Sequence, residues 1–327
     1  MKTDTMMKAV VCRAYGGPEV LQLAQMPMPQ PAPNEVLVQI KATAVTAADW
    51  RLRAGQPAAA RLFFGLTKPK YAIPGGVFAG TVVAAGTSVT RYKTGDKVYG
   101  SCALQYGFGA YAEYKTLPED GVFCHMPADM SFTDAATLPF GGLTALHFVH
   151  EAQLKAGNKV LISGASGAVG NMLLQMAKYH GAHVTATASA KNLPLLQRLG
   201  ADAAMDYAGK GLEGNREQYD VIFDTAGKAP VSLYKKMLKP GGRLVLVAAD
   251  MTQMMGAMLL ALTGKIKLSA GLARETYDHM RELTRLANEG YVRAVVDQIM
   301  PLEEIAEAHR LTQSGQKSGS IAIAVTK

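Results

Sequence analysis

The strongest constraint on the fold is a glycine-rich turn between an apolar strand and a helix. Residues 160–170 read Val-Leu-Ile-Ser-Gly-Ala-Ser-Gly-Ala-Val-Gly, with three glycines spaced three apart. Glycine permits a tight turn and close backbone approach to a pyrophosphate, and the following helix offers free N–H groups. This pattern predicts a dinucleotide-binding loop made of Gly164, Ala165, Ser166, Gly167, Ala168, Val169 and Gly170.

Strands and helices alternate around this loop. The expected strands are residues 159–163, 184–187, 203–206, 219–224, 243–248 and 266–270. Helical patterns lie between them, at 169–180, at 192–199 and in a segment ending near 238. This alternation predicts a doubly wound parallel sheet of the Rossmann type, and so an α/β fold.

The first 125 or so residues have a different rhythm. Short apolar runs are bounded by glycines and prolines, which predicts an all-β module. A helix is expected at 276–288, and the short β runs after it predict that the chain returns to complete the first domain. We therefore expect a β-rich substrate domain from residues 1–126 and 272–327, and a nucleotide-binding domain from residues 127–271.

The end of the second expected strand indicates which cofactor binds. NAD-specific folds usually place an acidic residue there, about 20 residues after the loop, to bind the ribose hydroxyls. Here no acid occurs between the loop and Asp202. Ser189 and Lys191 can instead hold a 2′-phosphate through a hydroxyl and a cation, which favours NADPH over NADH.

Composition bears on partners and on compartment. Cys12, Cys102 and Cys124 form no CxxC pair, which fits a reducing cytoplasm. The net charge of +8 has no basic run of five residues, so a nucleic acid is not expected. Residues 1–7 lack the apolar core of a signal peptide. The apolar stretch 251–262 is shorter than the roughly 20 residues that span a bilayer, so no membrane partner is expected.

Several segments together resemble one protein family, in the same order along the chain. They are residues 44–55, 74–80, 95–100, 109–114, 138–145, 164–170 and 301–309. The chain is similar to the zinc-independent quinone oxidoreductase branch of the medium-chain dehydrogenase/reductase superfamily. The resemblance implies a GroES-like barrel plus a Rossmann domain, an active cleft between them, and a homodimer. It also implies that NADPH is held by Thr144, the loop 164–170, Ser189, Lys191 and Tyr207.

Zinc ligands of the wider superfamily are missing. Zinc-dependent relatives place Cys at the position of Thr46 and a His-Glu pair at Gly76-Val77, and a catalytic zinc needs about three such ligands. We therefore expect no metal. Two departures from the zinc-independent pattern affect the acceptor side: Thr46 replaces a common Asn, and Gly319-Ser320 replaces the usual Gly-Lys.

Without a Lewis acid, alcohol oxidation is poorly supported, whereas hydride transfer to a conjugated acceptor needs less activation. We expect NADPH-dependent reduction of quinones or α,β-unsaturated carbonyls. Thr46 is hypothesised to donate a hydrogen bond to the acceptor oxygen, with Trp50 forming the pocket wall.

Two alternatives remain open. One is an NADPH-binding sensor or nucleic-acid-binding protein with little catalysis. The other is a membrane-associated reductase of lipid-like quinones, resting on segment 251–262, for which a buried or dimer-facing helix is the competing interpretation.

Overall fold

The computed structural model describes residues 5–208, 211–215, 217–248, 251–262, 264 and 266–326, so part of the N-terminal stretch 1–7 lies outside it. The chain forms two compact units. Unit 1 comprises Met1–Phe140, Thr276–Arg285 and Ala294–Lys327; unit 2 comprises Gly141–Glu275 and Leu286–Arg293. Helices α3 (Phe132–Ala152) and α9 (Tyr277–Asn288) each contribute residues to both units. The domain boundaries expected at residues 126 and 272 therefore stay a prediction.

Unit 2 is built on a parallel sheet. Its described strands are β8 (Lys159–Ser163), β9 (His183–Ala188), β10 (Ala203–Asp206), β11 (Tyr219–Asp224), β12 (Leu238–Leu246) and β13 (Lys267–Ala270). They lie in the order β10-β9-β8-β11-β12-β13, all parallel. This is the strand order of a Rossmann fold, with the chain reversing direction across the sheet after its first three strands. The doubly wound sheet expected from the sequence is confirmed.

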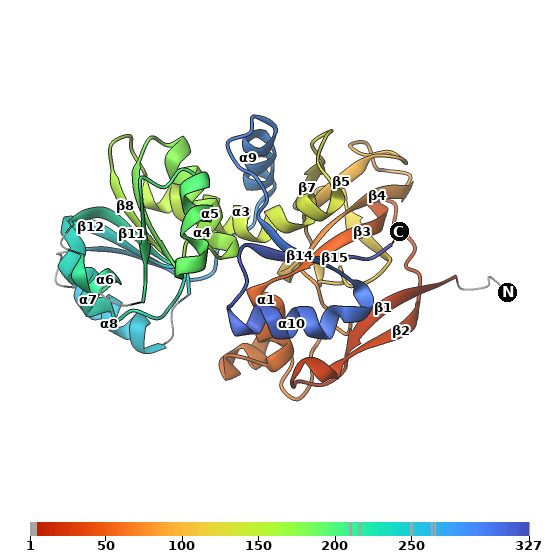
Figure 1. Cartoon of the computed structure of the whole chain (residues 1–327). Coiled ribbons are helices and arrows are strands. Elements are labelled where there is room, and N and C mark those ends of the chain that lie inside the picture. Colours follow the sequence, from red (N-terminus) through yellow and green to blue (C-terminus); the bar gives the residue numbers. More distant parts are fainter. Residues whose placement is uncertain are drawn as a thin grey trace. The chain divides into compact units, whose positions relative to one another are not determined.

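Helices cover both faces of this sheet (Figure 1). They are α4 (Ala168–Tyr179), α5 (Leu193–Arg198), α6 (Gly211–Gly214), α7 (Val231–Met237) and α8 (Met251–Leu262), with the 3-10 turn η4 (Ala190–Asn192). The face toward α7 and α8 is filled by buried aromatic and aliphatic side chains, among them Tyr219, Ile222, Tyr234 and Leu244. Burying these apolar surfaces is the main force that holds helices to the sheet.

One strand begins earlier than the sequence suggests. The glycine pair after Pro240 was expected to turn the chain into a strand at Arg243, yet β12 begins at Leu238. The pairing with β11 jumps from Tyr219–Leu238 to Val221–Arg243. The proline and glycines therefore form an irregularity within the strand, because proline has no N–H to donate to the neighbouring strand and glycine weakens a strand interior.

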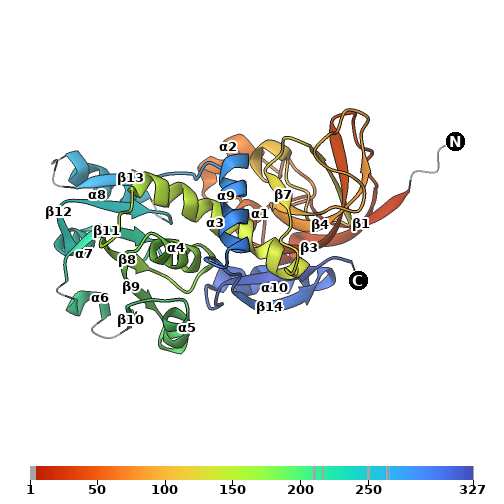
Figure 2. The same ribbon diagram turned by 90° about the horizontal axis from the view of Figure 1, so that it is seen from above.

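Unit 1 is the β-rich unit. Its described strands are β1 (Met6–Cys12), β2 (Leu21–Pro27), β3 (Glu35–Val45), β4 (Val77–Ala85), β5 (Lys97–Ser101), β6 (Tyr114–Pro118), β7 (Phe123–His125), β14 (Val296–Pro301) and β15 (Ser320–Ala324). One sheet runs β14-β15-β3-β4-β5-β7, with β6 also on β3, and β1 pairs with β2. The C-terminal strand β15 pairs antiparallel with β3, from Ile321–Val45 to Ala324–Ala42 (Figures 1 and 2). The expected return of the tail to the first β module is confirmed.

The expectation of an all-β module is wrong in detail, because unit 1 also contains helices. They are α1 (Ala47–Ala54), α2 (Arg61–Phe64) and α10 (Ile305–Ser314), with 3-10 turns η1 (Pro18–Val20), η2 (Ala58–Ala60), η3 (Leu104–Tyr106) and η5 (Leu302–Glu304). Helix α1 begins with a capping box between Thr46 and Asp49 and ends at Gly55, whose φ is +64°. These local signals fix both ends of the helix.

Three clusters of buried apolar residues lie in the described part of unit 1, the smallest around Met7, Ala9 and Ala112. Of the other two, one lies within the sheet and includes Val38, Phe78 and Phe123. The other joins α10 to the sheet through Leu302, Ile305 and Ile321, among others. Among the helices that the structure describes, none is long and apolar enough to cross a membrane.

Candidate active site

The three glycines of the turn between β8 and α4 have different structural roles. Gly164 has φ +79°, a conformation that side chains disfavour. A Cβ at Gly170 would lie 2.3 Å from the carbonyl oxygen of Gly164, so only glycine lets α4 pack this closely on the turn. At Gly167 the nearest atom would be the Gly164 oxygen, at 3.5 Å, which is ordinary contact. Gly164 and Gly170 therefore allow close packing within the turn, whereas the space beside Gly167 is not filled by other atoms of the chain.

This open turn fits the pyrophosphate of a dinucleotide. Gly167 is the N-cap of α4, and the first N–H groups of a helix have no partner within it. Ala168 and Val169 in this first turn are half-buried, as are Gly164, Ser166 and Gly167, whereas Ala165 is buried. Together the positive end of the helix dipole and the accessible backbone suit an anion.

A loop from the neighbouring strand supports the turn. At the end of β11, Asp224 accepts hydrogen bonds from the N–H groups of Ala226 and Gly227, each at 3.0 Å. Thr225 donates its hydroxyl to the carbonyl oxygens of Ser163 and Gly164. Asp224 is fully buried, and burial raises its pKa. No local pattern in the sequence marks this loop, because its role depends on β11 lying beside β8.

The residues expected on the adenine side meet at the carboxyl edge of the sheet. Ser189 follows β9, and Tyr207 follows β10, where its N–H donates to Ala188 at 3.1 Å. Lys191 is exposed in the turn η4. Lys228, which the sequence analysis missed, places its ammonium 5.9 Å from the Tyr207 ring. Two cations thus lie at the edge where Ser189 and Tyr207 are.

Thr144 lies on helix α3, which touches the start of α4. A Cβ at Gly141, one turn earlier, would be 2.4 Å from the carbonyl oxygen of Ala168. Thr144 itself is half-buried. The expected nucleotide residues of unit 2 therefore surround one end of its sheet.

In unit 1, Thr46 is engaged with a buried carboxylate. Its hydroxyl donates to Asp49 Oδ2 at 2.7 Å, and its N–H donates to the same oxygen at 2.8 Å. The Asp49 carboxyl also accepts hydrogen bonds from the Tyr111 hydroxyl and the Gly76 N–H. Asp49 is 2% exposed, and burial raises its pKa to about 6 against the opposing effect of these hydrogen bonds.

The network continues to helix α10. The Tyr111 hydroxyl lies 3.2 Å from Nε2 of His309, and both residues are fully buried. Burial, and then the charge of Arg53, lowers the pKa of His309 to about 3, so this imidazole is neutral. The direction of the hydrogen bond between the Tyr111 hydroxyl and His309 Nε2 depends on the tautomer of the imidazole.

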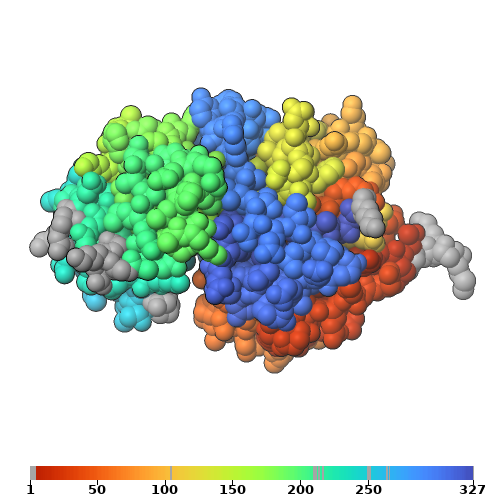
Figure 3. All heavy atoms as spheres, in the orientation of Figure 1, coloured from red at the N-terminus to blue at the C-terminus, as the bar shows by residue number. Residues whose placement is uncertain are grey.

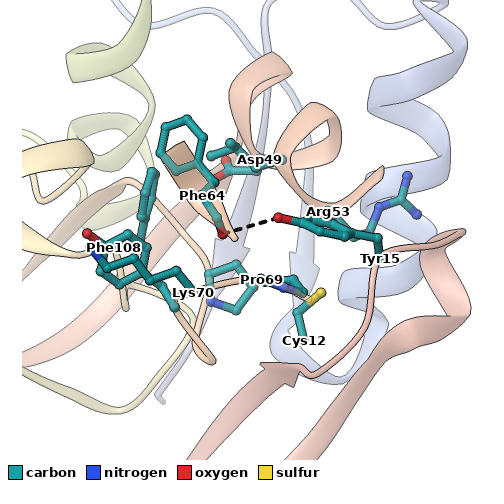
Figure 4. Close-up of a pocket in the computed structure, with 11 residues that line it drawn as sticks. Cys12, Tyr15, Asp49, Arg53, Phe64, Pro69, Lys70 and Phe108 are labelled. Carbon is teal, nitrogen blue, oxygen red and sulfur yellow. Dashed lines mark hydrogen bonds between the residues drawn. The ribbon is translucent and has the colours of Figure 1, made fainter. Parts of the chain in front are cut away.

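A cavity of about 40 Å³ opens beside α1 in unit 1 (Figure 4). Rings dominate its walls, and Phe108 lies 6.2 Å from Phe64 and 5.5 Å from Tyr71 between ring centroids. The lining residues are Cys12, Tyr15, Asp49, Leu52, Arg53, Phe64, Pro69, Lys70, Tyr71, Pro74 and Phe108. Its lining is largely apolar, but at about 40 Å³ the cavity is far smaller than the roughly 300–1,000 Å³ of pockets that hold a small molecule, so it has room for only part of one.

Neither residue hypothesised for the acceptor lines this cavity. Thr46 is 6% exposed, and its single hydroxyl hydrogen is held by Asp49 while that carboxyl is ionised. Trp50 is half-buried on α1, with the Arg51 guanidinium 5.4 Å from its ring centroid. The sequence analysis missed Asp49, although a polar pair spaced Thr-x-x-Asp is a signature of a helix start.

Among the residues that the structure describes, no three His, Cys, Asp or Glu side chains are grouped as a metal site. The pair His147 and Glu151 approaches to 3.6 Å on α3. Cys12, Cys102 and Cys124 are buried and unpaired with one another.

A glycine-rich nucleotide turn on a Rossmann sheet, in a chain that also folds a GroES-like β unit, defines the medium-chain dehydrogenase/reductase class. Residues 32–128 match the family described as "Alcohol dehydrogenase GroES-like domain", and residues 199–323 match "Zinc-binding dehydrogenase".

Full-length relatives narrow the class. The chain is 32% identical to the "Chloroplast envelope quinone oxidoreductase homolog" of Arabidopsis thaliana, over 97% of this chain and 98% of that protein. It is 30% identical to the "NADPH-dependent alkenal/one oxidoreductase, chloroplastic" of the same plant, over 97% and 79%. The solved quinone oxidoreductase of Coxiella burnetii superposes with a TM-score of 0.87 at 29% identity, over 98% and 100%. The chain belongs to the quinone oxidoreductase-like branch of this superfamily and is an oxidoreductase of that type.

The close packing at Gly170 gives a testable prediction. Gly170→Ala places a methyl group 2.3 Å from the Gly164 oxygen, so α4 must move away from the turn. We expect roughly tenfold weaker binding of a nicotinamide dinucleotide by fluorescence titration, and a loss of about 1–3 kcal/mol in unfolding free energy. The control is Gly256→Ala on α8, where an added Cβ meets nothing within 4 Å. It should lower neither the affinity for the dinucleotide nor the free energy of unfolding. Unchanged binding in Gly170→Ala would contradict the role of this turn.

Proposed function

We propose that this protein is an NADPH-dependent reductase that transfers hydride to quinones or α,β-unsaturated carbonyl compounds without zinc. The observation that carries the proposal is the turn 164–170, whose glycines leave room for a pyrophosphate at the start of α4. Its relatives include proteins named for quinone reduction and for alkenal reduction. Both substrate types are conjugated acceptors.

The preference for NADPH rests on charge at the carboxyl edge of unit 2. Lys191 and Lys228 carry two cations there, Ser189 adds a hydroxyl, and no acid follows β9 before Asp202. A 2′-phosphate carries about two negative charges and attracts such a pair. An alkenal reductase relative bears NADPH in its name.

Bound NADPH would supply the hydride, and the protein's own residues would place the acceptor and exclude water. We propose that α1 forms the acceptor side. Asp49, Leu52 and Arg53 of this helix line the aromatic cavity of unit 1, and Trp50 lies on the same helix. Rings such as Phe64 and Phe108 offer an apolar surface to a planar conjugated group.

Thr46 enters this proposal through the protonation of Asp49. An ionised Asp49 takes the Thr46 hydrogen, but a protonated one carries its own and can donate to Thr46 Oγ1, 2.7 Å away. That reversal would free the Thr46 hydrogen for an acceptor oxygen at the start of α1, outside the aromatic cavity, which Thr46 does not line. The groups facing Asp49 from other elements are the Tyr111 hydroxyl, backed by neutral His309, and the Gly76 N–H.

We also propose that the protein is a homodimer formed through unit 2. Strand β13 is an edge of the sheet, so one side of it is open to pairing. On the adjacent helix α8, Met255, Met258, Leu259 and Leu262 are 55–84% exposed. This helix carries no charge in its first or last turn, which suits contact with another apolar protein surface. Of the two interpretations of segment 251–262, a buried or a dimer-facing helix, this exposure supports the second, while Ala257 and Leu260 on the same helix are buried.

The three cysteines support a reducing compartment such as the cytoplasm, since none is paired with another.

The function is tested by NADPH and NADH oxidation at 340 nm with small quinones and enones, with a chelator present. We expect chelator-resistant turnover that prefers NADPH, and a rise of about tenfold in the KM for NADPH, not NADH, in Lys191→Ala. Lys235→Ala, an exposed lysine on α7, is the matched control. NADPH binding without reduction of any acceptor would replace the reductase by a sensor, and salt-sensitive RNA binding would favour the nucleic-acid alternative.

The Thr46 proposal predicts a pH profile. Above the pKa of Asp49, the protonated fraction of this carboxyl falls about tenfold per pH unit. Turnover should therefore rise as the pH falls toward about 6 and then level off. Thr46→Ser keeps the hydroxyl and should keep this profile, whereas Thr46→Val should lose both the slope and most of the turnover. NADPH affinity should be unchanged in both variants. An identical slope in Thr46→Val would remove Thr46 from the mechanism.

The dimer is tested by light scattering after size-exclusion chromatography. The wild type should elute with twice the chain mass of 34.7 kDa, and Leu259→Lys should elute as the single chain, because a buried unpaired ammonium is costly. Leu23→Lys, on the exposed face of β2, should remain dimeric. A wild type of 34.7 kDa would refute the dimer.

A further inference from the structure

Residues 61–70 carry apolar side chains that the fold leaves uncovered. Leu62, Phe63 and Leu66 are 71%, 78% and 67% exposed. Single exposed apolar residues are ordinary, but three large ones within five residues form a cluster that usually marks an interaction site. The orange part of the chain that contains them reaches the lower surface of the molecule in Figure 3.

This exposure is built into the fold. The Tyr15 hydroxyl contacts the carbonyl oxygens of Phe64 at 3.1 Å and Gly65 at 2.6 Å, and the Lys70 N–H donates to Phe64 at 2.6 Å (Figure 4). Phe64 lines the cavity, with its ring near that of Phe108. Because Phe64 is held inward, its neighbours Leu62 and Phe63 are held outward.

The charges nearest the cluster along the chain have one sign. No acidic residue occurs between Asp49 and Asp96, and the cations within or next to the segment are Arg61, Lys68 and Lys70. Arg53 is buried and Arg91 lies against Tyr277 on α9, so these two do not add to this surface. Lys68 and Lys70 are exposed directly beside the apolar cluster. The surface therefore offers apolar side chains and positive charge together.

This combination differs from the other exposed apolar surface, on α8. That helix has no charged residue, so an apolar protein surface suits it. Segment 61–70 instead matches a boundary between negative headgroups and acyl chains, where Phe and Leu enter and Lys binds the headgroups. A nucleic acid would match the cations but leave Leu62, Phe63 and Leu66 in water.

We propose that segment 61–70 docks this protein on the surface of an anionic lipid bilayer. Leu62, Phe63 and Leu66 enter the headgroup boundary, and Lys68 and Lys70 face the lipid phosphates. The contact is peripheral and needs no spanning helix.

Docking would bring one wall of the unit 1 cavity to the lipid surface. Phe64, Pro69, Lys70 and Tyr71 line that cavity and belong to, or directly follow, the docking segment. Acceptors dissolved in the bilayer, such as lipid-derived enals or quinones with apolar tails, would then reach the cavity most easily. This last consequence rests on the proposed function, whereas the docking itself does not.

Co-sedimentation with vesicles tests the docking without any activity measurement. Phosphatidylcholine vesicles with 30% phosphatidylglycerol should bind the full chain, and phosphatidylcholine alone should bind it at least tenfold more weakly. Raising the salt concentration should weaken binding to the anionic vesicles, because the headgroup attraction is screened. Equal binding to both vesicles, or none to the anionic ones, would overturn the proposal.

Matched variants distinguish an effect of segment 61–70 from a general effect of positive charge or of exposed apolar residues elsewhere on the chain. Lys68→Gln with Lys70→Gln should weaken binding about 25-fold, since each cation near an anionic surface contributes about fivefold. Lys235→Gln with Lys236→Gln, two exposed lysines on α7, removes the same charge elsewhere and should matter about twofold at most. Leu62→Ser with Phe63→Ser should weaken binding to the anionic vesicles tenfold or more, whereas Leu23→Ser on β2 should leave that binding unchanged. Equal effects in segment and control variants would overturn the assignment.

A tryptophan reporter shows what the segment touches. Trp50 is the chain's only tryptophan, so Trp50→Phe with Phe63→Trp puts the single fluorophore in the cluster. Its emission should shift to the blue with anionic vesicles and be quenched by lipids brominated on the acyl chains. If the emission wavelength instead changes with protein concentration and does not change when vesicles are added, a second copy of the chain covers the segment and the lipid proposal fails.

Discussion

The architecture of unit 1 depends on satisfying one buried carboxylate. Asp49 is 2% exposed, and an ionised carboxyl in that position must be hydrogen-bonded on several sides. Its donors come from the start of α1, from Gly76 just before β4 and from Tyr111. Tyr111 in turn contacts His309 on α10. A helix, a strand start and a C-terminal helix are thus tied to one charge, and the incomplete compensation leaves the pKa of Asp49 at about 6.

Unit 2 depends on a constraint of space. Gly170 brings α4 against the Gly164 carbonyl, and Gly141 brings α3 against Ala168. Thr225, just after β11, donates its hydroxyl to the same turn, and Asp224 holds the loop that carries Thr225. The result is a closely packed turn at the carboxyl edge of a parallel sheet, where open α/β folds bind their ligands.

Two groups of exposed apolar residues among those described form chemically different surfaces. Met258 and Leu259 lie on a helix without charge beside an edge strand, which suits another copy of the chain. Leu62 and Phe63 lie among cations, which suits a negative boundary. Apolar exposure alone does not identify a partner, and the neighbouring charge decides between them.

The sequence by itself determined what depends on local order along the chain. The spacing of Gly164, Gly167 and Gly170 and the alternation of strands and helices predicted the Rossmann sheet, because backbone freedom and periodicity are encoded within about ten residues. Tertiary structure alone decided which residues far apart in sequence become neighbours. It brought Tyr111, and through it His309, to the Asp49 that caps α1, placed Lys228 beside Tyr207, and turned Phe64 inward while leaving Phe63 exposed. Burial, and therefore pKa and exposure, arises only when separate segments pack together, so no local pattern announces it.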